Sequence, residues 1–405
     1  MTWLVSLSIA LLLSSTAPVF GQYGSTGYTN PTRLISAAPP FTQADIRIMD
    51  SILGLTPDQR ELTDALFQEF FDRYRESASG VRLEVEALVE EATITQKQQP
   101  LHEGRAIVDE WTKRRDAMRA QFVEDLRLLM DQHQIRLWPK VERELRRKDQ
   151  IGNGRIAGES IDIIRLVDAH IDGWQENAEL VAELDRYAER MDRALVARDK
   201  LIASDEGKEF YSLQTSDPDA ALRLHNEALE LRTRVLRINT NALDRLGAHL
   251  SSEQHNTILH AFYEQATERV IPDSPIAHRI AAARKLPTLT ATQRERMAPA
   301  LKRYDDTALA TKREMFEALS QTQIDIVPAR LHKELQRRAE GDEHVDHYLL
   351  EQPQPLLDKA LKDRLDRERA AWSAIKPILT TSQLEDLPRL DMNMVQFTQI
   401  AWFGL

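Results

Sequence analysis

Histidines and carboxylates cluster in one short stretch of the chain, Asp342-Glu343-His344-Val345-Asp346-His347. If this stretch is helical, its two imidazoles lie one turn apart beside carboxylates, and these are ligand types that hold a divalent metal ion. A solvated run of charges after Gly341 explains the same residues, and no other helix visibly supplies a further ligand. Asp342, His344 and His347 are therefore weak metal candidates, and we expect a charged surface run rather than a metal site.

The usual signatures of enzymes are missing from the sequence. The chain has no Cys to act as a nucleophile and no Gly-x-Ser-x-Gly elbow. His102-Glu103 lacks a second His four residues on, as a zinc protease requires, and residues 152–158 lack the Lys-Ser/Thr of a phosphate-binding loop. We therefore expect that the protein is not an enzyme, with no catalytic residue and no cofactor.

A different pattern recurs through the chain: Leu, then Ser or Thr, then Gln three residues after the hydroxyl. Its five copies are Leu55–Gln59, Leu250–Gln254, Leu289–Gln293, Leu319–Gln323 and Leu379–Gln383. In a capping box, the hydroxyl accepts a hydrogen bond from the third amide of a helix, and the Gln side chain accepts one from the amide of the capping residue. Each copy is therefore predicted to begin a helix, through Thr56 and Gln59, Ser251 and Gln254, Thr290 and Gln293, Ser320 and Gln323, and Thr380 and Gln383. Asp131 and Gln134 form a sixth box with Asp as the cap.

The composition predicts long helices. Only 14 Gly and 17 Pro interrupt 405 residues, and 42% of the residues are hydrophobic, which is enough to bury real cores. We predict an all-α fold of long antiparallel helical hairpins that pack as a coiled-coil-like bundle. Three divergent repeat units are expected at residues 45–155, 156–271 and 272–405, with turns at 93–100, 152–158, 204–218 and 272–287.

Two stretches have apolar residues at coiled-coil-like spacing. From Ile164 to Leu195 the apolar residues lie three and four apart, which predicts one very long helix. From Leu222 to Leu250 leucines recur every seven residues, and other apolar residues line the opposite side. A helix that is apolar on two sides packs against more than one neighbour, so we expect this helix to be central.

The net charge and the N-terminal segment predict which partners and which cellular compartment to expect. The net charge of −11 is spread along the chain and argues against nucleic acid as a partner. Residues 1–21 carry no charge and contain a short apolar run, which predicts a signal peptide, and residues 22–44 predict a disordered linker. We expect a periplasmic or secreted protein with no transmembrane anchor after cleavage. Because no Lys or Arg precedes the apolar run, an uncleaved N-terminal anchor is the alternative.

The repeated Leu-Thr-x-x-Gln boxes, in an acidic helical chain with an export signal and no Cys, resemble the LTxxQ family of periplasmic stress proteins, the Spy and CpxP type. That family forms helical hairpins that assemble into cradle-shaped dimers. The resemblance implies ATP-independent holding of unfolded proteins, or signalling of envelope stress, and some relatives bind zinc.

Two classes of function follow. The first is an exported helical protein that binds other proteins, either as a chaperone-like protein or as an envelope-stress protein, and that could form homo-oligomers. The second is a structural or scaffolding coiled-coil protein of the cell envelope, and a metal-binding envelope sensor is a third reading. An exposed apolar concave face would favour the chaperone, whereas fully buried apolar stripes would favour the scaffold.

Overall fold

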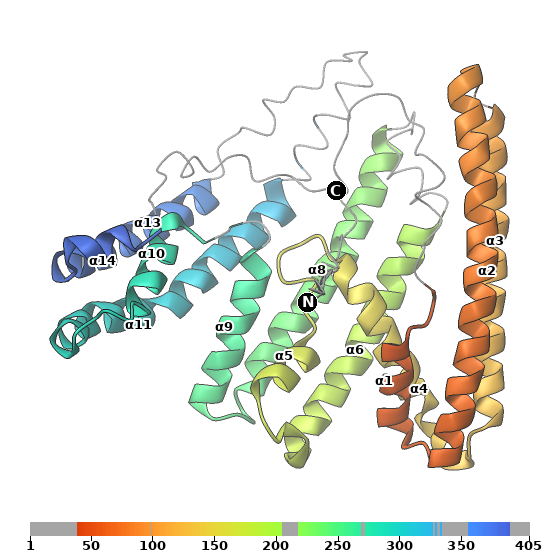
Figure 1. The fold of residues 1–405 in the computed structure, drawn as a ribbon, viewed down its shortest axis with the longest axis horizontal. Helices are drawn as coiled ribbons and strands as arrows, with labels where there is room; N and C mark the ends of the chain where they lie inside the picture. The colour runs from red at the N-terminus through yellow and green to blue at the C-terminus, as the bar shows by residue number, and fades with distance from the viewer. Residues whose placement is uncertain are drawn as a thin grey trace, which may run out of the picture.

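Figure 1 shows the fold in a computed structural model, which describes residues 39–97, 99–204, 218–268, 271, 273–326, 329, 333 and 355–388. Twelve α-helices and no strand occur in these residues, so the predicted all-α fold is confirmed. The expected signal peptide and most of the expected linker lie outside the described residues. Each helix in the described part is too short or too polar to cross a membrane.

The first group of helices is a long hairpin beside two short helices. The long helices α2 (Pro57–Thr95) and α3 (Gln99–Leu128) run antiparallel along one edge of the molecule (Figure 1). They turn within the predicted segment 93–100, where Gln96 has the left-handed φ of 54° that often ends a helix. The short helices α1 (Gln43–Leu53) and α4 (Gln132–Gln150) pack against each other next to the lower half of this hairpin.

The folded part of the chain begins earlier than expected. Phe41, which the sequence assigned to the linker, is 2% exposed and lies 5.2 Å from Phe122 between ring centroids. Helix α1 begins at Gln43, because the Asp45 carboxylate accepts a hydrogen bond from the Thr42 amide at 2.7 Å and completes a capping box. This box has Asp at the position where the repeated motif has Gln, and so the sequence pattern missed it.

The second group has the same order of short and long helices. Its members are α5 (Ile163–His170), α6 (Ala178–Ala203), α8 (Pro218–Leu246) and α9 (Ser252–Glu268). The long helices α6 and α8 pack against each other, and the short helices α5 and α9 do the same.

The predicted single helix from Ile164 to Leu195 is wrong, because the chain breaks between α5 and α6. Gly173 adopts a φ of 67° there, a conformation that is strained for a residue with a side chain. Asn177 then caps α6, with its side chain accepting from the Leu180 amide at 3.1 Å. The apolar spacing continues through this turn because the residues on both sides of it face the same core.

The third group repeats the order once more, with α10 (Pro275–Arg284), α11 (Ala291–Gln321), α13 (Pro355–Ile375) and α14 (Thr381–Glu385). A π-helical turn, Thr322–Ile326, continues α11, and 3₁₀ turns lie at Ile151–Asn153, Trp174–Glu176 and Lys376–Ile378. A short–long–long–short order thus occurs three times in the described residues. Divergent repeats of one ancestral unit would show this order. A common origin of the three groups of helices stays a prediction.

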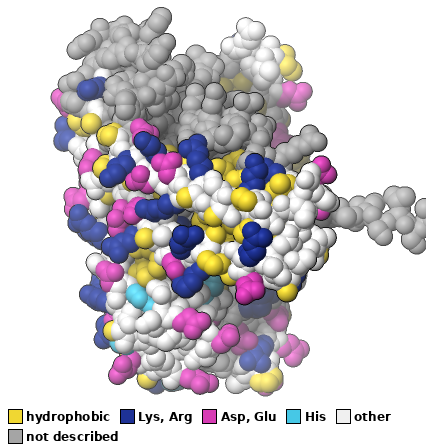
Figure 2. Space-filling model, turned by 90° about the vertical axis from the view of Figure 1, so that its left-hand side faces the viewer, with side chains coloured by type: hydrophobic (Ala, Val, Ile, Leu, Met, Phe, Trp, Pro, Cys, Tyr) yellow, Lys and Arg dark blue, Asp and Glu magenta, His cyan; other side chains and the backbone are white. Residues whose placement is uncertain are grey.

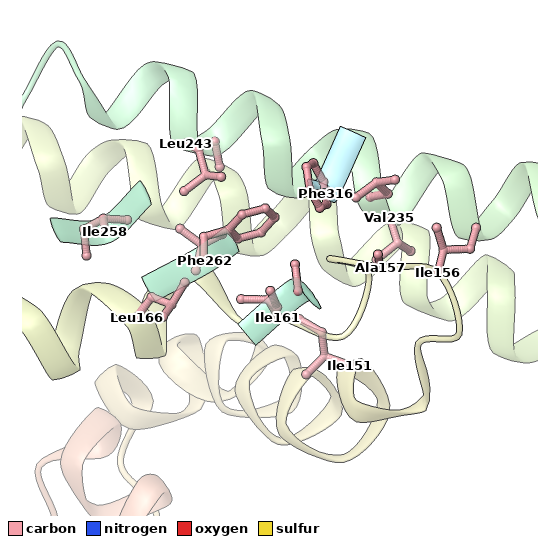
Figure 3. Packing of buried hydrophobic residues seen from close by; sticks show 14 of the residues in the cluster. Ile151, Ile156, Ala157, Ile161, Leu166, Val235, Leu243, Ile258, Phe262 and Phe316 are labelled. Atoms are coloured by element: carbon pink, nitrogen blue, oxygen red, sulfur yellow. The ribbon is translucent and has the colours of Figure 1, made fainter. Parts of the chain in front are cut away.

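The second and third groups of helices share a core with the loop that follows the first group. Helix α4 packs on α6, and α9 packs on α11. The loop of residues 151–162, between α4 and α5, runs through this core, and Figure 3 shows its buried residues Ile151, Ile156, Ala157 and Ile161. Beside it, the rings of Phe262 and Phe316 pack edge to face at 5.4 Å. A loop buried in this way needs internal hydrogen-bond partners for its backbone.

Candidate functional site: paired capping boxes and a buried polar network

Most of the predicted capping boxes form. At the start of α2, the Thr56 hydroxyl accepts from the Gln59 amide at 3.3 Å, and the Gln59 side chain accepts from the Thr56 amide at 3.0 Å. The same pair of bonds begins α9, α11 and α14, at Ser251 and Gln254, Thr290 and Gln293, and Thr380 and Gln383. Asp131 and Gln134 begin α4 in the same way. These helix starts are confirmed.

The copy at Leu319–Gln323 does not begin a helix, so that prediction is wrong. Ser320 is buried inside α11, and the helix runs through it into the π-helical turn. The amide of Thr322 already donates to the carbonyls of Ala318 and Leu319 in the preceding turn. A capping box accepts hydrogen bonds from amides that have no carbonyl partner in the helix. In this copy, carbonyls of the preceding helical turn already accept such bonds.

Gln323 of this copy instead contacts the buried loop. Its Oε1 accepts from the Ala157 amide at 2.7 Å, and its Nε2 lies 3.5 Å from the Arg155 carbonyl oxygen. The π-helical turn therefore joins the third group of helices to the loop that follows the first group. π-Helical turns in α-helices often occur at functional sites, and here the turn brings one amide side chain against buried backbone.

The Gln residues of two boxes meet in the first group. Nε2 of Gln59 donates to Oε1 of Gln134 and to the Leu129 carbonyl, both at 2.8 Å. Nε2 of Gln134 lies 2.9 Å from Oε1 of Gln59 and 3.4 Å from the Leu53 carbonyl oxygen. Each Gln thus bonds the backbone that leads into the other box.

The third group has the same arrangement. Nε2 of Gln293 donates to Oε1 of Gln383 and to the Ile378 carbonyl, both at 2.9 Å, and Nε2 of Gln383 donates to the Thr288 carbonyl at 3.0 Å. The paired Gln residues are 75 residues apart in the first group and 90 in the third. The Gln of a paired box therefore does more than begin its own helix, because it also fixes one helix start against another.

The box of the second group is not paired in this way. Gln254 is exposed and its side chain bonds only within its own box among the described residues. The backbone that leads into this box is bonded by Asn177, the cap of α6, instead of by a Gln. Its side chain donates to the carbonyl of His249, two residues before Ser251, at 3.2 Å. The protein therefore contains paired and unpaired copies of the same motif.

This difference predicts unequal effects of the same substitution. Gln59→Ala is expected to lower the free energy of unfolding by about 2–3 kcal/mol, because it removes a cap and the bonds to the facing box. Gln254→Ala should cost about 1 kcal/mol or less. Urea unfolding followed by circular dichroism measures both losses. The Gln59→Ala and Gln134→Ala losses should also be non-additive when combined, and equal losses at Gln59 and Gln254 would contradict the pairing.

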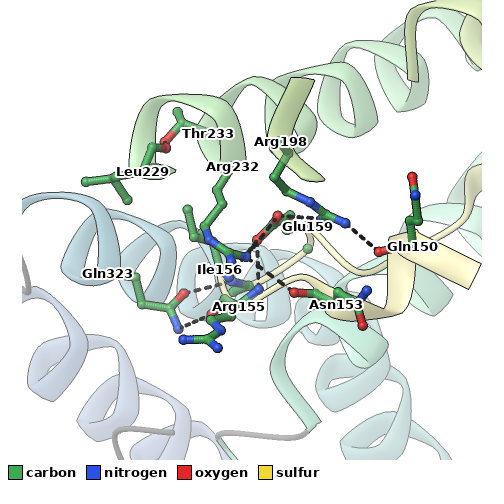
Figure 4. Close-up of polar contacts among 12 residues, drawn as sticks. Gln150, Asn153, Arg155, Ile156, Glu159, Arg198, Leu229, Arg232, Thr233 and Gln323 are labelled. Carbon is green, nitrogen blue, oxygen red and sulfur yellow. Dashed lines mark hydrogen bonds and ion pairs between the residues drawn. The ribbon is translucent and has the colours of Figure 1, made fainter. Parts of the chain in front are cut away.

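A carboxylate lies at the centre of the buried loop. Glu159 has no exposed surface, and its Oε2 accepts from the amides of Arg155 at 2.7 Å and Ile156 at 3.2 Å (Figure 4). Arg198 of α6 bonds its Oε1 at 2.8 Å, and Arg232 of α8 bonds its Oε2 at 3.2 Å. Both guanidinium groups are buried, so this carboxylate provides a negative charge shared by two positive ones.

Polar side chains from the second and third groups bond the loop and the helix before it. Arg198 also donates to the carbonyl of Gln150, the last residue of α4. Asn239 of α8 donates to the Gly158 carbonyl at 2.7 Å. Gln323 of the third group accepts from the Ala157 amide, and Figure 4 shows its side chain pointing toward the loop. The buried backbone is thereby satisfied by side chains that come from distant parts of the chain.

Helix α8 supplies Arg232 and Asn239 to this network from one buried polar stripe. His225, Arg232 and Asn239 recur every seven residues and are all buried. Burial and the nearby Arg232 lower the pKa of His225 to about 4. Helix α8 packs on α5, α6 and α9, which confirms its expected central position. The seven-residue spacing of these polar residues was the signal that could have revealed the stripe.

The polar network bonds backbone groups of the loop, but its carboxylate is not accessible to a substrate. Both oxygens of Glu159 are bonded and no part of the side chain is exposed. The Tyr187 hydroxyl donates to Asn239 at 3.0 Å and accepts from the Ile163 amide at 3.3 Å, and burial raises its pKa well above the ordinary range. The arrangement is suited to holding three groups of helices together.

The weak metal candidates Asp342, His344 and His347 lie outside the described residues. Within the described part, no group of three His, Cys, Asp or Glu side chains could hold a metal ion. The fold and the network thus define an all-α protein in which three groups of helices surround a buried loop. The chain matches no known protein family, no curated protein and no solved structure.

Proposed function

We propose that this chain is an exported, non-enzymatic helical protein that binds other proteins of the cell envelope and holds them at a fixed spacing. The α2–α3 hairpin is its contact arm. The charge-free segment 1–21 supports export, and the long hairpin supports binding at a distance from the shared core.

The hairpin is the observation that carries this proposal. Helix α2 has 39 residues, which corresponds to a length of roughly 58 Å. Its outer half has a small core of its own, formed by Tyr74, Ala78, Val81, Val85, Val108 and Trp111. Leu83 and Ile94 on this outer half are 68% and 74% exposed. An arm that is stabilised internally can reach a partner at a distance from the shared core.

The distribution of apolar residues favours a scaffold over a general holder of unfolded chains. Most large apolar residues of the described helices are buried, and the exposed ones are widely separated in sequence: Leu62, Leu83, Ile94, Leu128, Ile135, Val196 and Leu356. On the face in Figure 2, hydrophobic side chains lie in small groups among Lys, Arg, Asp and Glu. A holder of unfolded proteins would need a larger continuous apolar surface than such groups provide.

A chaperone-like function is the second candidate. The observation that favours it is the pair of facing boxes in the first and third groups, since repeated boxes carry the resemblance to the LTxxQ stress proteins. An excess of the protein would then suppress aggregation of a chemically denatured client without ATP, as measured by light scattering. Unchanged aggregation at several-fold excess would remove this candidate and leave the scaffold.

Site-specific photo-crosslinking in the native cell tests the contact arm. A photoreactive residue at Leu83 or Ile94 is expected to give a discrete crosslinked product, because both side chains are exposed on the arm. Val196 is the matched control, since it is 41% exposed but lies on α6. Mass spectrometry identifies the partner and distinguishes a second copy of this chain from another protein. Products of equal yield at Val196 would contradict the assignment of the hairpin as the arm.

A further inference from the structure

A cavity of about 260 Å³ lies where the second and third groups of helices meet. Residues of α9 form one side, and residues of α10, α11 and α13 form the others. The space is partly open to solvent, so a small molecule can reach its lining. Small-molecule sites occur preferentially at such interfaces between units.

The wall of the cavity carries both signs of charge. Helix α9 contributes Glu264 and Glu268, which lie one helical turn apart, and α11 contributes Lys312. Lys312 bonds Glu264 at 2.8 Å, while Glu268 makes no ion pair with a described residue. A lysine ammonium has three donors, so Lys312 retains capacity for an anionic group. The carboxylate of Glu268 can accept a hydrogen bond from a cationic group of a ligand.

The rest of the lining is preformed. Arg364 and Glu368 of α13 are buried and bond each other at 2.7 Å, which fixes polar groups in the wall. Ile271 and Met315 are also buried and supply an apolar part. Most of the other lining residues are charged or polar, so the lining suits a small charged ligand better than an apolar one.

We propose that this cavity binds a small zwitterion of the amino-acid or short-peptide class. Its ammonium group would bond Glu268 and Glu264, its carboxylate would bond Lys312, and its side chain would contact Ile271 and Met315. This binding is independent of the contact arm, because the hairpin lies in the first group of helices and the cavity lies between the second and third.

Calorimetric titration of the full chain with three dipeptides tests the proposal. Ala-Leu with free termini is expected to bind with a Kd below about 1 mM, and its N-acetylated and C-amidated forms at least tenfold more weakly, since each lacks one charge. Glu268→Gln and Lys312→Gln should each weaken binding of the free dipeptide about tenfold. Lys302→Gln is the matched control, because Lys302 lies on the exposed surface of α11 and pairs with Asp306.

Unaltered circular dichroism of the variants would show that any loss of affinity is local. No heat with any of the three dipeptides would overturn the proposal, and so would equal affinity for the free and blocked forms. Equal affinity of Lys302→Gln and Lys312→Gln would place the ligand elsewhere and would also overturn it. Light scattering and crosslinking at the arm report on the proposed function separately.

Discussion

Glu159→Gln is expected to lower the free energy of unfolding by about 3–5 kcal/mol, because it removes the negative charge that two buried guanidinium groups share. The side chains of Arg198 and Arg232 are 1% and 2% exposed, so water cannot take the place of the carboxylate. Glutamine keeps the shape of the residue, and the loss therefore reports on charge and hydrogen bonding rather than on a cavity. Urea unfolding followed by circular dichroism measures it.

An exposed ion pair provides the control. Glu317 pairs with Arg313 at 2.7 Å on α11, and both side chains are more than half exposed. Glu317→Gln should therefore cost less than about 1 kcal/mol, as is usual for surface ion pairs. Similar losses for Glu159→Gln and Glu317→Gln would show that the buried network does not hold the groups of helices together.

Gly158→Ala is expected to destabilise the protein by about 2–5 kcal/mol, for two separate reasons. Gly158 has a φ of 80°, which is strained for alanine. An added Cβ would also lie 2.8 Å from Phe316, 3.0 Å from Phe262 and 3.1 Å from Leu236, in the middle of the shared core. The loop or these side chains would have to move. Thermal unfolding measures the loss.

The same substitution at another glycine should have the opposite sign. Gly80 lies inside α2, and an added Cβ there would meet nothing within 4 Å. Gly80→Ala should therefore stabilise the hairpin by about 0.5–1 kcal/mol, because alanine has the higher helix propensity. Destabilisation by Gly80→Ala would contradict the helical structure of the arm, and tolerance of Gly158→Ala would contradict the close packing of the loop.

The boxes were predictable because their bonds join residues only three apart. The hydroxyl of Thr56 and the side chain of Gln59 bond each other's amides, so four consecutive residues contain the whole interaction. The same is true of Thr290 with Gln293. The all-α fold followed from composition for a related reason, since helix propensity depends on the residue type and can be summed over a short window of sequence.

The copy at Leu319–Gln323 shows the limit of such local patterns. Its residues are as suitable for a box as those of the other copies, yet Ser320 lies inside a helix that is already formed. Apolar spacing misled in a similar way between Ile164 and Leu195, because it reports which core a residue faces and not whether the helix is continuous.

The sequence by itself determined the helical class and five of the six helix starts predicted from capping boxes, because these depend on bonds and propensities within a few residues. Only the tertiary structure decided which Gln residues pair, that the loop is buried, and that Glu159 meets Arg232 and Gln323 meets Ala157. Those last contacts join residues 73 and 166 positions apart. From the sequence alone, polar residues such as Arg232 and Asn239 are expected to be exposed to solvent. They are buried here because the packing of other helices places a partner of matching charge or hydrogen-bonding capacity against each of them.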